Sequence, residues 1–218
     1  MGNKKELVQR SYLFEVRAQQ DEEEKYVVEG RAIVYDSITD LGFCYEIIEP
    51  GALDNTDLTD VRFLVNHDIS KIPLARSRKN NENSTMQLFV DEQGLRIKVY
   101  LDIENNAEAR ALYSAIQRGD ITGMSFMFSI SAEEWEELES EKPTHKIREI
   151  LSVVEVSAVT FPAYEDTDIY ARDKSRMENL RRSLESERES ARTLENVSKL
   201  TFEQRTLLTM YGGKKTCQ

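Results

Sequence analysis

The sequence is poor in the residues that most often carry metal-binding or catalytic chemistry. It has two cysteines and two histidines among 218 residues. Cys44 and Cys217 lie far apart and without the spacing of metal ligands, so neither a disulfide framework nor a zinc site is expected, and a reducing compartment fits. No apolar run is long enough to span a bilayer, and the first residues lack the apolar core of a signal peptide. We therefore expect a cytosolic protein without a membrane partner.

Positive charge is also in short supply. The 29 Lys and Arg residues face 40 Asp and Glu residues, which gives a net charge of −11. Binding to nucleic acid through its phosphates requires a surplus of basic side chains, so nucleic acid is not expected as a main partner. The length of 218 residues leaves room for one sizeable domain with an appendage, and the hydrophobic fraction of 39% argues against disorder throughout.

Short strands separated by turns are predicted for most of the chain, from about residue 12 to residue 170. β-branched and aromatic residues alternate with polar ones in several runs, and two neighbouring runs joined around Asp91 to Gly94 are typical of a hairpin. The strand-like segments are residues 11–19, 25–35, 61–68, 83–102, 121–138 and 145–164.

Two segments have a helical pattern instead. Residues 105–120 carry apolar side chains at helical spacing, with an asparagine to cap the start and Gly119 to end the helix. After Tyr170 the composition shifts, and residues 172–200 mix both charge signs with apolar residues at three-, four- and seven-residue spacings. That pattern predicts a polar helix that seeks a partner, or a weak coiled coil. We therefore divide the chain into an arm at 1–11, a main domain at 12–171 and a charged helical extension at 172–218.

Any serine–histidine mechanism must use one of the two histidines. His67 ends an apolar strand just as the chain turns polar, a location that suits a base at a barrel rim and is also typical of an ordinary surface residue. His145 stands beside Pro143 and Lys146 after an acidic connection. We expect His145 to be exposed to solvent and to have no catalytic role.

The apolar stretch ITGMSFMFSI raises the question of why it keeps hydroxyl groups. Strand alternation places Ser125 and Ser129 on one face and Phe126 and Phe128 on the other. The serines are then either the polar outer face of a strand or the location of a nucleophile. Gly123 favours the second interpretation, because a glycine permits a tight turn or the close approach of a substrate backbone. Ser125 lies nearest to that turn.

Glu155 lies in the middle of ILSVVEVSAV, a run that is apolar on both faces and predicts a buried strand. An ionised carboxylate out of water needs a partner. That partner is either an arginine, in a structural salt bridge, or an imidazole whose tautomer the carboxylate fixes during catalysis.

Four segments in this order resemble the tailed-bacteriophage prohead proteases. They are VVEGRAIVYDSITDLGFCYEIIEPGAL, VNHD, GMSFMF and EVSAVTFPAY, and the resemblance runs from about Val27 to Ala171. Proteins of this family are capsid maturation serine proteases, similar in fold to the herpesvirus assemblins. The resemblance implies a β-rich α+β fold, a mostly antiparallel β-barrel with a few surrounding helices, and residues 12–171 as the protease domain.

The resemblance also implies a catalytic triad without a cofactor or metal. Ser125 would be the nucleophile, His67 the general base and Glu155 the residue that orients His67. Many relatives have glycine in an S-x-G-F pattern where this chain has Met127, which concerns the local backbone rather than the nucleophile. Main-chain N–H groups are expected to form the oxyanion hole, and the turn FPAYEDT is a candidate contributor.

For partners, the resemblance implies the phage major capsid protein and its scaffolding segment as substrates, and the protease itself as a further substrate. It places the activity in the host cytoplasm, inside assembling proheads, and suggests a homodimer. The extension at 172–218 is either a scaffold-binding or self-cleaved segment, or a helix packed on the barrel. A non-enzymatic scaffolding or assembly protein is the alternative class. An α/β-hydrolase is disfavoured, because the sequence lacks a G-x-S-x-G elbow and alternating helices.

Overall fold

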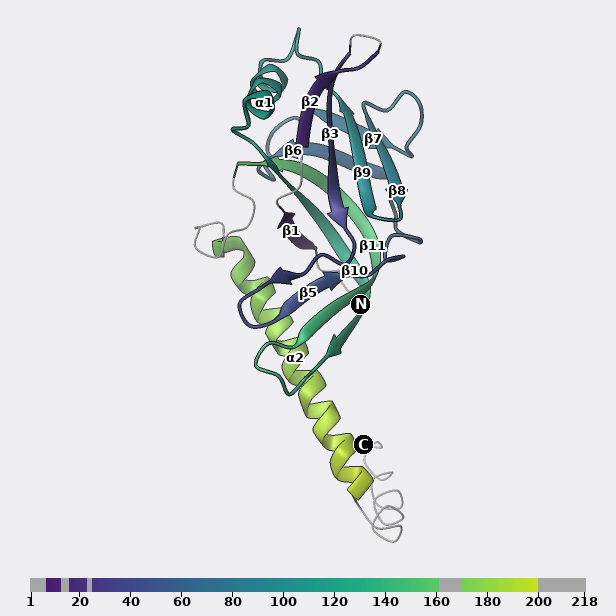
Figure 1. The fold of residues 1–218 in the computed structure, drawn as a ribbon, viewed down its shortest axis with the longest axis vertical. Helices are drawn as coiled ribbons and strands as arrows, with labels where there is room; N and C mark the ends of the chain where they lie inside the picture. Colours follow the sequence, from purple (N-terminus) through teal and green to yellow (C-terminus); the bar gives the residue numbers. More distant parts are fainter. Residues whose placement is uncertain (1–6, 13–15, 23–24, 161–169, 200–218) are drawn as a thin grey trace, which may run out of the picture. The chain divides into compact units, whose positions relative to one another are not determined.

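The computed structural model describes residues 7–12, 16–22, 25–160 and 170–199. The chain divides into two units, one made of residues 1–136 and 141–168 and the other of residues 137–140 and 169–218. The first unit holds the described strands and α1, and the second holds α2 (Figure 1).

A seven-stranded sheet is built around the two longest strands, β10 and β11, which run antiparallel to each other. β1 pairs antiparallel with the other side of β10 and forms an edge of the sheet (Figure 1). β5 and β6 both pair in parallel with β11, one near its start and one near its end. The strands of this sheet are β1 (Val8–Tyr12), β4 (Thr39–Asp40), β5 (Tyr45–Ile48), β6 (Asp60–Val65), β7 (Ala75–Arg78), β10 (Gly123–Glu136) and β11 (Thr144–Val159).

A second sheet has four antiparallel strands in the order β2-β3-β9-β8. The predicted hairpin at 83–102 is present as β8 and β9. Gly94 begins β9 with a φ of 130°, and a Cβ at this position would lie 2.1 Å from the carbonyl oxygen of Ile33. Only glycine therefore lets β9 approach β3 this closely. The strands are β2 (Val16–Gln20), β3 (Tyr26–Val34), β8 (Met86–Asp91) and β9 (Gly94–Tyr100).

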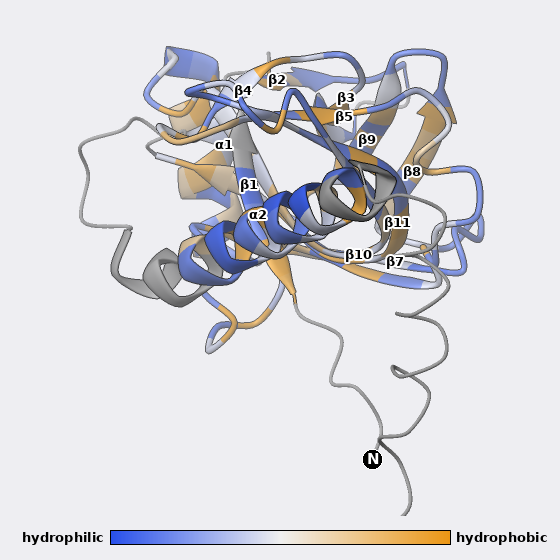
Figure 2. Cartoon of the chain, turned by 90° about the horizontal axis from the view of Figure 1, so that it is seen from below, coloured by the Kyte–Doolittle hydropathy of each residue, from blue (hydrophilic) through white to orange (hydrophobic). Residues whose placement is uncertain are grey.

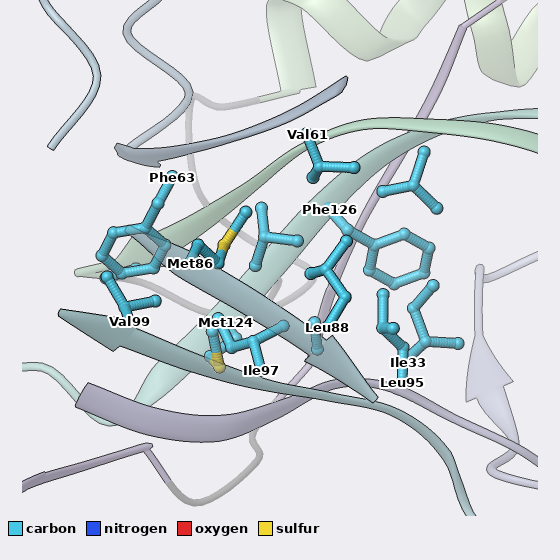
Figure 3. Packing of buried hydrophobic residues seen from close by; sticks show 14 of the residues in the cluster. Ile33, Val61, Phe63, Met86, Leu88, Leu95, Ile97, Val99, Met124 and Phe126 are labelled. Atoms are coloured by element: carbon cyan, nitrogen blue, oxygen red, sulfur yellow. The ribbon is translucent and has the colours of Figure 1, made fainter. Parts of the chain in front are cut away.

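The hydrophobic core takes side chains from both sheets, and Figure 3 shows how they interdigitate. Met124, Phe126 and Phe128 of β10 are fully buried in this core. Each buried side chain of this size contributes about 1.5–3 kcal/mol through the hydrophobic effect. Because side chains alternate along a strand, this packing turns Ser125 of β10 to the opposite face of the sheet.

The short helix α1 (Ala107–Arg118) lies where the sequence predicts it, and both of its ends have the expected caps. The Asn106 side chain accepts hydrogen bonds from two backbone N–H groups of the first turn, and Gly119 ends the helix with a φ of 77°. Leu112 and Ile116 are among the buried residues that tie α1 to the core.

The predicted charged helix is present as α2 (Tyr170–Lys199) in the second unit. Figure 2 shows its described residues as mostly hydrophilic. Within this unit the Arg188 guanidinium donates hydrogen bonds to the carbonyl oxygens of Leu138 (2.7 Å) and Ser140 (3.2 Å). Of the helices that the structure describes, none combines the length and the apolar character that crossing a membrane requires.

These elements confirm a β-rich α+β fold with few helices. The described strands pair as two sheets, and no pairing among them closes a barrel, so the predicted barrel is not confirmed. Residues 8–11 of the segment assigned to an arm belong to β1 and pair with β10.

Candidate active site

His67 lies in a tight turn that directly follows β6. Asn66 and His67 have positive φ values of 51° and 57°. The Asp68 N–H donates to the carbonyl oxygen of Val65 across the turn at 3.1 Å. Two central residues with positive φ and this closing hydrogen bond are typical of a type I′ turn. The turn ends the strand abruptly and directs the His67 side chain back to the sheet, where it is 8% exposed.

Hydrogen bonds to β11 and to the residue after it hold this turn in place. The Asn66 side chain donates to the Thr160 hydroxyl (3.1 Å) and accepts from the Thr160 N–H (3.0 Å). The His67 N–H donates to the Ser157 hydroxyl at 3.1 Å. A positive φ is unfavourable for residues other than glycine and persists when surrounding contacts determine it, a situation that is common at functional sites.

The Glu155 side chain comes from β11, is 1% exposed and meets the His67 ring. His67 Nδ1 and Glu155 Oε1 are 2.5 Å apart. The second carboxylate oxygen accepts a hydrogen bond from the Ser157 hydroxyl at 2.6 Å. The structure therefore brings His67 and Glu155 together, and both oxygens of the carboxylate have a partner.

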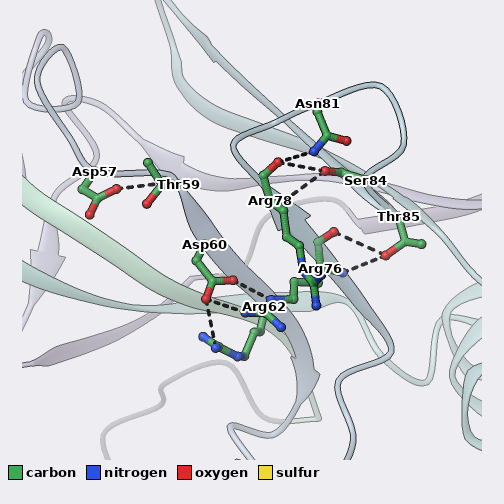
Figure 4. Close-up of polar contacts among 9 residues, drawn as sticks. All are labelled: Asp57, Thr59, Asp60, Arg62, Arg76, Arg78, Asn81, Ser84 and Thr85. Carbon is green, nitrogen blue, oxygen red and sulfur yellow. Dashed lines mark hydrogen bonds and ion pairs between the residues drawn. The ribbon is translucent and has the colours of Figure 1, made fainter.

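The alternative of a salt bridge between Glu155 and an arginine has an obvious candidate, because Arg62 of β6 is the register partner of Glu155. Arg62 is instead paired with Asp60, at 3.0 Å. Figure 4 shows Asp60 between Arg62 and Arg76, and the Arg76 side chain also bonds its carboxylate. The Glu155 carboxylate bonds to the His67 imidazole and to the Ser157 hydroxyl. These contacts agree with the interpretation in which the carboxylate orients an imidazole, and not with a structural salt bridge.

Ser125 lies on β10 directly opposite Ser157 in the strand register. Residues paired in this way project to the same face, with Cβ atoms about 4.5–5.5 Å apart. Ser125 is fully buried, and its hydroxyl donates a hydrogen bond to the carbonyl oxygen of Arg10 on β1 at 2.7 Å. The interpretation of the serines as a solvent-facing strand surface is therefore wrong for Ser125.

His67 Nε2 is buried and has no hydrogen-bond partner within the described part of the chain. The hydrogen bond of the Ser125 hydroxyl to Arg10 thus leaves the imidazole nitrogen that a base would use without a proton donor. The structure places Ser125, His67 and Glu155 around Ser157. His67 is hydrogen-bonded to Glu155, whereas the Ser125 hydroxyl bonds to the Arg10 carbonyl oxygen and not to the imidazole.

Sequence reasoning missed Ser157, which bonds both to the Glu155 carboxylate and to the His67 backbone. The sequence contained one signal for Ser157. Ser157 stands two residues after Glu155 on the same strand, so alternation places both side chains on one face. What the sequence alone did not show is that the turn containing His67 lies beside that face.

The predicted solvent exposure of His145 is wrong. This residue is fully buried, with its ring 4.7 Å from the Trp135 ring between centroids. Its Nδ1 lies 3.1 Å from Glu46 Oε2 and its Nε2 lies 3.0 Å from Glu133 Oε2. Glu46 comes from β5 and Glu133 from β10, so the imidazole is enclosed by residues of neighbouring strands.

Nearby charges and hydrogen bonds shift the pKa values of Glu46 and His145. Burial raises the pKa of Glu46, but the Arg10 guanidinium and the hydrogen bonds from His145 and Arg10 outweigh burial and lower the pKa from 4.5 to about 2. Burial lowers the pKa of His145, and its hydrogen bonds to Glu133 and Glu46 outweigh that effect, so the pKa rises above 6.5. Two carboxylate partners, one at each ring nitrogen, thus favour the protonated imidazole.

Acid is expected to weaken the fold through Glu46. Its pKa is depressed in the folded chain, so the stabilisation is complete above pH 4.5 and disappears as the pH falls towards about 2. The difference between the two pKa values corresponds to roughly 3 kcal/mol. Urea unfolding of the wild type and of Glu46→Gln should show a gap in unfolding free energy that narrows between about pH 6 and pH 3. A gap that stays constant over this range would contradict the assignment.

No group of three or more His, Cys, Asp or Glu side chains is arranged to hold a metal ion among the residues that the structure describes. The site consists of hydroxyl, imidazole and carboxylate groups, which are the groups of acyl-transfer chemistry.

Comparison with known proteins assigns the chain to a family. A sequence model of the family described as caudovirus prohead serine protease matches residues 13–183. The matched range is most of the chain and includes His67, Ser125 and Glu155. The chain belongs to this family.

Two individual proteins are similar to the chain. The prohead protease of Enterobacteria phage HK97 is 30% identical over 149 residues. The alignment covers 66% of this chain and 59% of the length of the HK97 protein. Among solved structures, the bacteriophage T4 capsid assembly protease gp21 gives a TM-score of 0.44 at 11% identity, covering 73% of this chain and all of that one.

Proposed function

We propose that this chain is a serine endopeptidase of phage head assembly, which cleaves capsid protein or its scaffolding segment through Ser125, His67 and Glu155. The observation that carries the proposal is the buried hydrogen bond between His67 and Glu155. Glu155 lies on β11, next to the strand β10 that carries buried Ser125, and all three residues lie within the range that matches the family.

Glu155 has the role of orienting the base. A carboxylate at Nδ1 keeps a proton on that nitrogen, so the lone pair of the neutral imidazole is on Nε2. Nε2 is the atom without a partner among the described residues, and it is shielded from solvent. Ser157 adds a second constraint, because it bonds to Glu155 Oε2 and accepts the His67 N–H.

The reaction follows the acyl-enzyme route. Ser125 Oγ attacks the carbonyl carbon of the scissile bond while His67 Nε2 takes the hydroxyl proton. The C–N bond of the tetrahedral intermediate then breaks, and His67 returns the proton to the leaving amine. Water attacks the acyl-enzyme with His67 again as base, which releases the new carboxyl terminus and restores the serine. Glu155 stays ionised and stabilises the imidazolium formed in each half.

The chain requires one rearrangement before it can act. The Ser125 hydroxyl must leave the Arg10 carbonyl oxygen, to which it now donates, and turn to His67 Nε2. Catalytic hydrogen bonds are often unmade in a protein without substrate and form in the substrate complex.

The finer features of the proposal concern architecture and assembly. The two sheets share one core, as the walls of an assemblin-like barrel would. The protease domain would act inside assembling proheads in the host cytoplasm, as a homodimer. The extension at 172–218 would bind scaffold or be removed by self-cleavage, and the charged surface of α2 suits a polar partner.

A non-enzymatic assembly protein is the second candidate, and the long charged helix α2 is the feature that favours it. Co-expression with the major capsid protein of the same phage separates the two functions. A protease shortens the capsid protein at a defined peptide bond, which mass spectrometry of the assembled shells detects. Capsid protein that assembles at full length in the presence of folded wild-type chain would support the assembly protein instead.

A further inference from the structure

The edge strand β1 places the Arg10 side chain against buried Glu46, and the carbonyl oxygen of the same residue against the hydroxyl of the proposed nucleophile, Ser125. The Arg10 guanidinium forms a two-point contact with the Glu46 carboxylate, from Nε to Oε1 and from Nη2 to Oε2, the latter at 2.5 Å. Glu46 is fully buried, and the Arg10 side chain is 10% exposed. Paired contacts of this kind are specific for the planar guanidinium group.

The acidic site is built without any contribution from β1. Glu46 comes from β5, His145 from β11 and Glu133 from β10. His145 bridges the two carboxylates, and the Trp135 ring lies against the imidazole. The Glu46 carboxylate is therefore oriented by its own neighbours, with one side left for a guanidinium.

Charge counting shows that this site favours a cation. Without Arg10, the two carboxylates of Glu46 and Glu133 face at most one positive charge, on His145, and the Arg10 guanidinium adds a second cation beside Glu46. An ionised carboxylate in a buried position is costly without a compensating charge. A chain whose β1 has moved away would thus present a preformed site for another arginine side chain.

The backbone of β1 lies where an extended substrate would have to lie. β1 pairs antiparallel with the edge of β10, with Ser11 opposite Ser125 and Arg10 opposite Phe126. Arg10 contributes two contacts: its side chain bonds to Glu46, and its carbonyl oxygen accepts a hydrogen bond from the Ser125 hydroxyl at 2.7 Å. Addition of a peptide strand to an exposed sheet edge is a common mode of recognition, in which side-chain pockets supply the specificity.

We propose that Glu46, held by His145, is the recognition group of a subsite for an arginine side chain of an extended peptide, and that β1 occupies this subsite with Arg10. The inference rests on the proposed function for its link to catalysis. A peptide bound as β1 is bound presents the carbonyl group of its arginine to Ser125, so cleavage is expected on the carboxyl side of arginine. β1 itself acts as a competitor, because it fills the subsite and engages the nucleophile.

Binding of a matched pair of peptides tests the subsite without requiring catalysis. The probe is a fluorescent peptide with the sequence LVQRSYL, residues 7–13 of this chain, and its partner has citrulline in place of arginine. Citrulline keeps the shape of the side chain and removes its charge. The full-length chain with Ser125→Ala and Arg10→Gln should bind the arginine peptide about 10- to 100-fold more tightly than the citrulline peptide, because a buried charge-assisted hydrogen bond is lost.

Two further variants in the same background assign the preference to Glu46. Glu46→Gln should reduce the preference to within about threefold, since the amide keeps the shape and loses the charge. Glu134→Gln, an exposed position on β10 paired with Arg148, removes the same charge from the chain and should leave the preference intact. Restoring Arg10 should weaken binding of the arginine peptide several-fold, because β1 competes for the site again.

If the chain with Ser125→Ala and Arg10→Gln binds the two peptides equally, or binds neither, the proposed subsite is refuted. This comparison does not require the Glu46→Gln variant to fold. A preference that survives in folded Glu46→Gln would also overturn it. The active chain with Arg10→Gln and intact Ser125 separates this outcome from failure of the proposed function. Selective binding without hydrolysis would refute the protease and keep the subsite, whereas hydrolysis that ignores arginine would refute the subsite alone.

Discussion

Replacement of Ser125 by alanine is expected to lower kcat/KM for peptide cleavage by about 10⁴- to 10⁶-fold. The loss is this large because, in the proposed mechanism, the Ser125 hydroxyl oxygen forms the covalent bond to the substrate. In the folded chain the change removes the hydrogen bond from Ser125 Oγ to the Arg10 carbonyl oxygen. The effect on stability should therefore be small beside the effect on rate.

Ser129→Ala is the matched control for this variant. Ser129 lies on the same strand, is 2% exposed and bonds to the Ser152 hydroxyl at 2.8 Å. Its replacement also deletes one buried hydroxyl, but at a distance from His67 and Glu155, so kcat/KM should stay within a few-fold of the wild type. Capsid processing and circular dichroism of both variants check the prediction. Full processing by folded Ser125→Ala, or equal losses in the two variants, would refute the nucleophile.

Replacement of Glu155 by glutamine is expected to lower kcat by about 10³- to 10⁴-fold with little change in KM. The amide has almost the shape of the carboxylate, but its NH₂ group favours the tautomer with the lone pair on Nδ1. Nε2 then carries the proton and cannot accept another from Ser125. The amide also lacks the charge that stabilises the imidazolium ion.

Glu149→Gln supplies the control on the same strand. Glu149 of β11 is only partly buried, and its carboxylate accepts a hydrogen bond from the side chain of Asn55, an exposed residue, at 3.5 Å. This variant should retain wild-type rates. Triad residues act as a unit, so the double variant Ser125→Ala, Glu155→Gln should be no slower than Ser125→Ala alone. A rate loss in Glu155→Gln that multiplies with the loss in Ser125→Ala would show that Glu155 acts elsewhere.

Features with local signals were predictable from the sequence. The β8–β9 hairpin follows from two alternating runs around a turn, and α1 follows from apolar spacing between Asn106 and Gly119. The partnership of Glu155 with His67 was one of two alternatives, because a carboxylate in an apolar strand requires a partner and histidines are few. The family resemblance, rather than the pattern, selected the imidazole.

The features that were missed depend on contacts between distant parts of the chain. The polar residues next to His145 in the sequence predicted that it is exposed, yet its ring is buried and bonds to Glu46, 99 residues away. In the same way, nothing within residues 8–12 shows that this strand lies on β10, or that its Arg10 carbonyl meets Ser125, 115 residues later. Local pattern predicts that a strand forms, and long-range packing determines which strand it pairs with.

The position of β1 also explains why the Ser125 hydroxyl bonds to the Arg10 carbonyl oxygen and not to His67 Nε2. A hydroxyl bonded to a carbonyl oxygen points its proton away from any base, so the β1-paired chain would be nearly inactive. Opening of a short edge strand costs less free energy than global unfolding, and such local openings let a peptide compete. Activity would then depend on how often β1 leaves the edge of β10.

The central claim is that His67 activates Ser125, and covalent labelling with a fluorophosphonate tests it most directly. The full-length chain with Arg10→Gln is incubated with the probe, and peptide mapping by mass spectrometry locates the adduct. We predict a single adduct on Ser125, formed at least about 10²-fold faster than in the same chain with His67→Ala. An adduct on another serine, no adduct, or equal labelling of Ser125 with and without His67 would contradict the account.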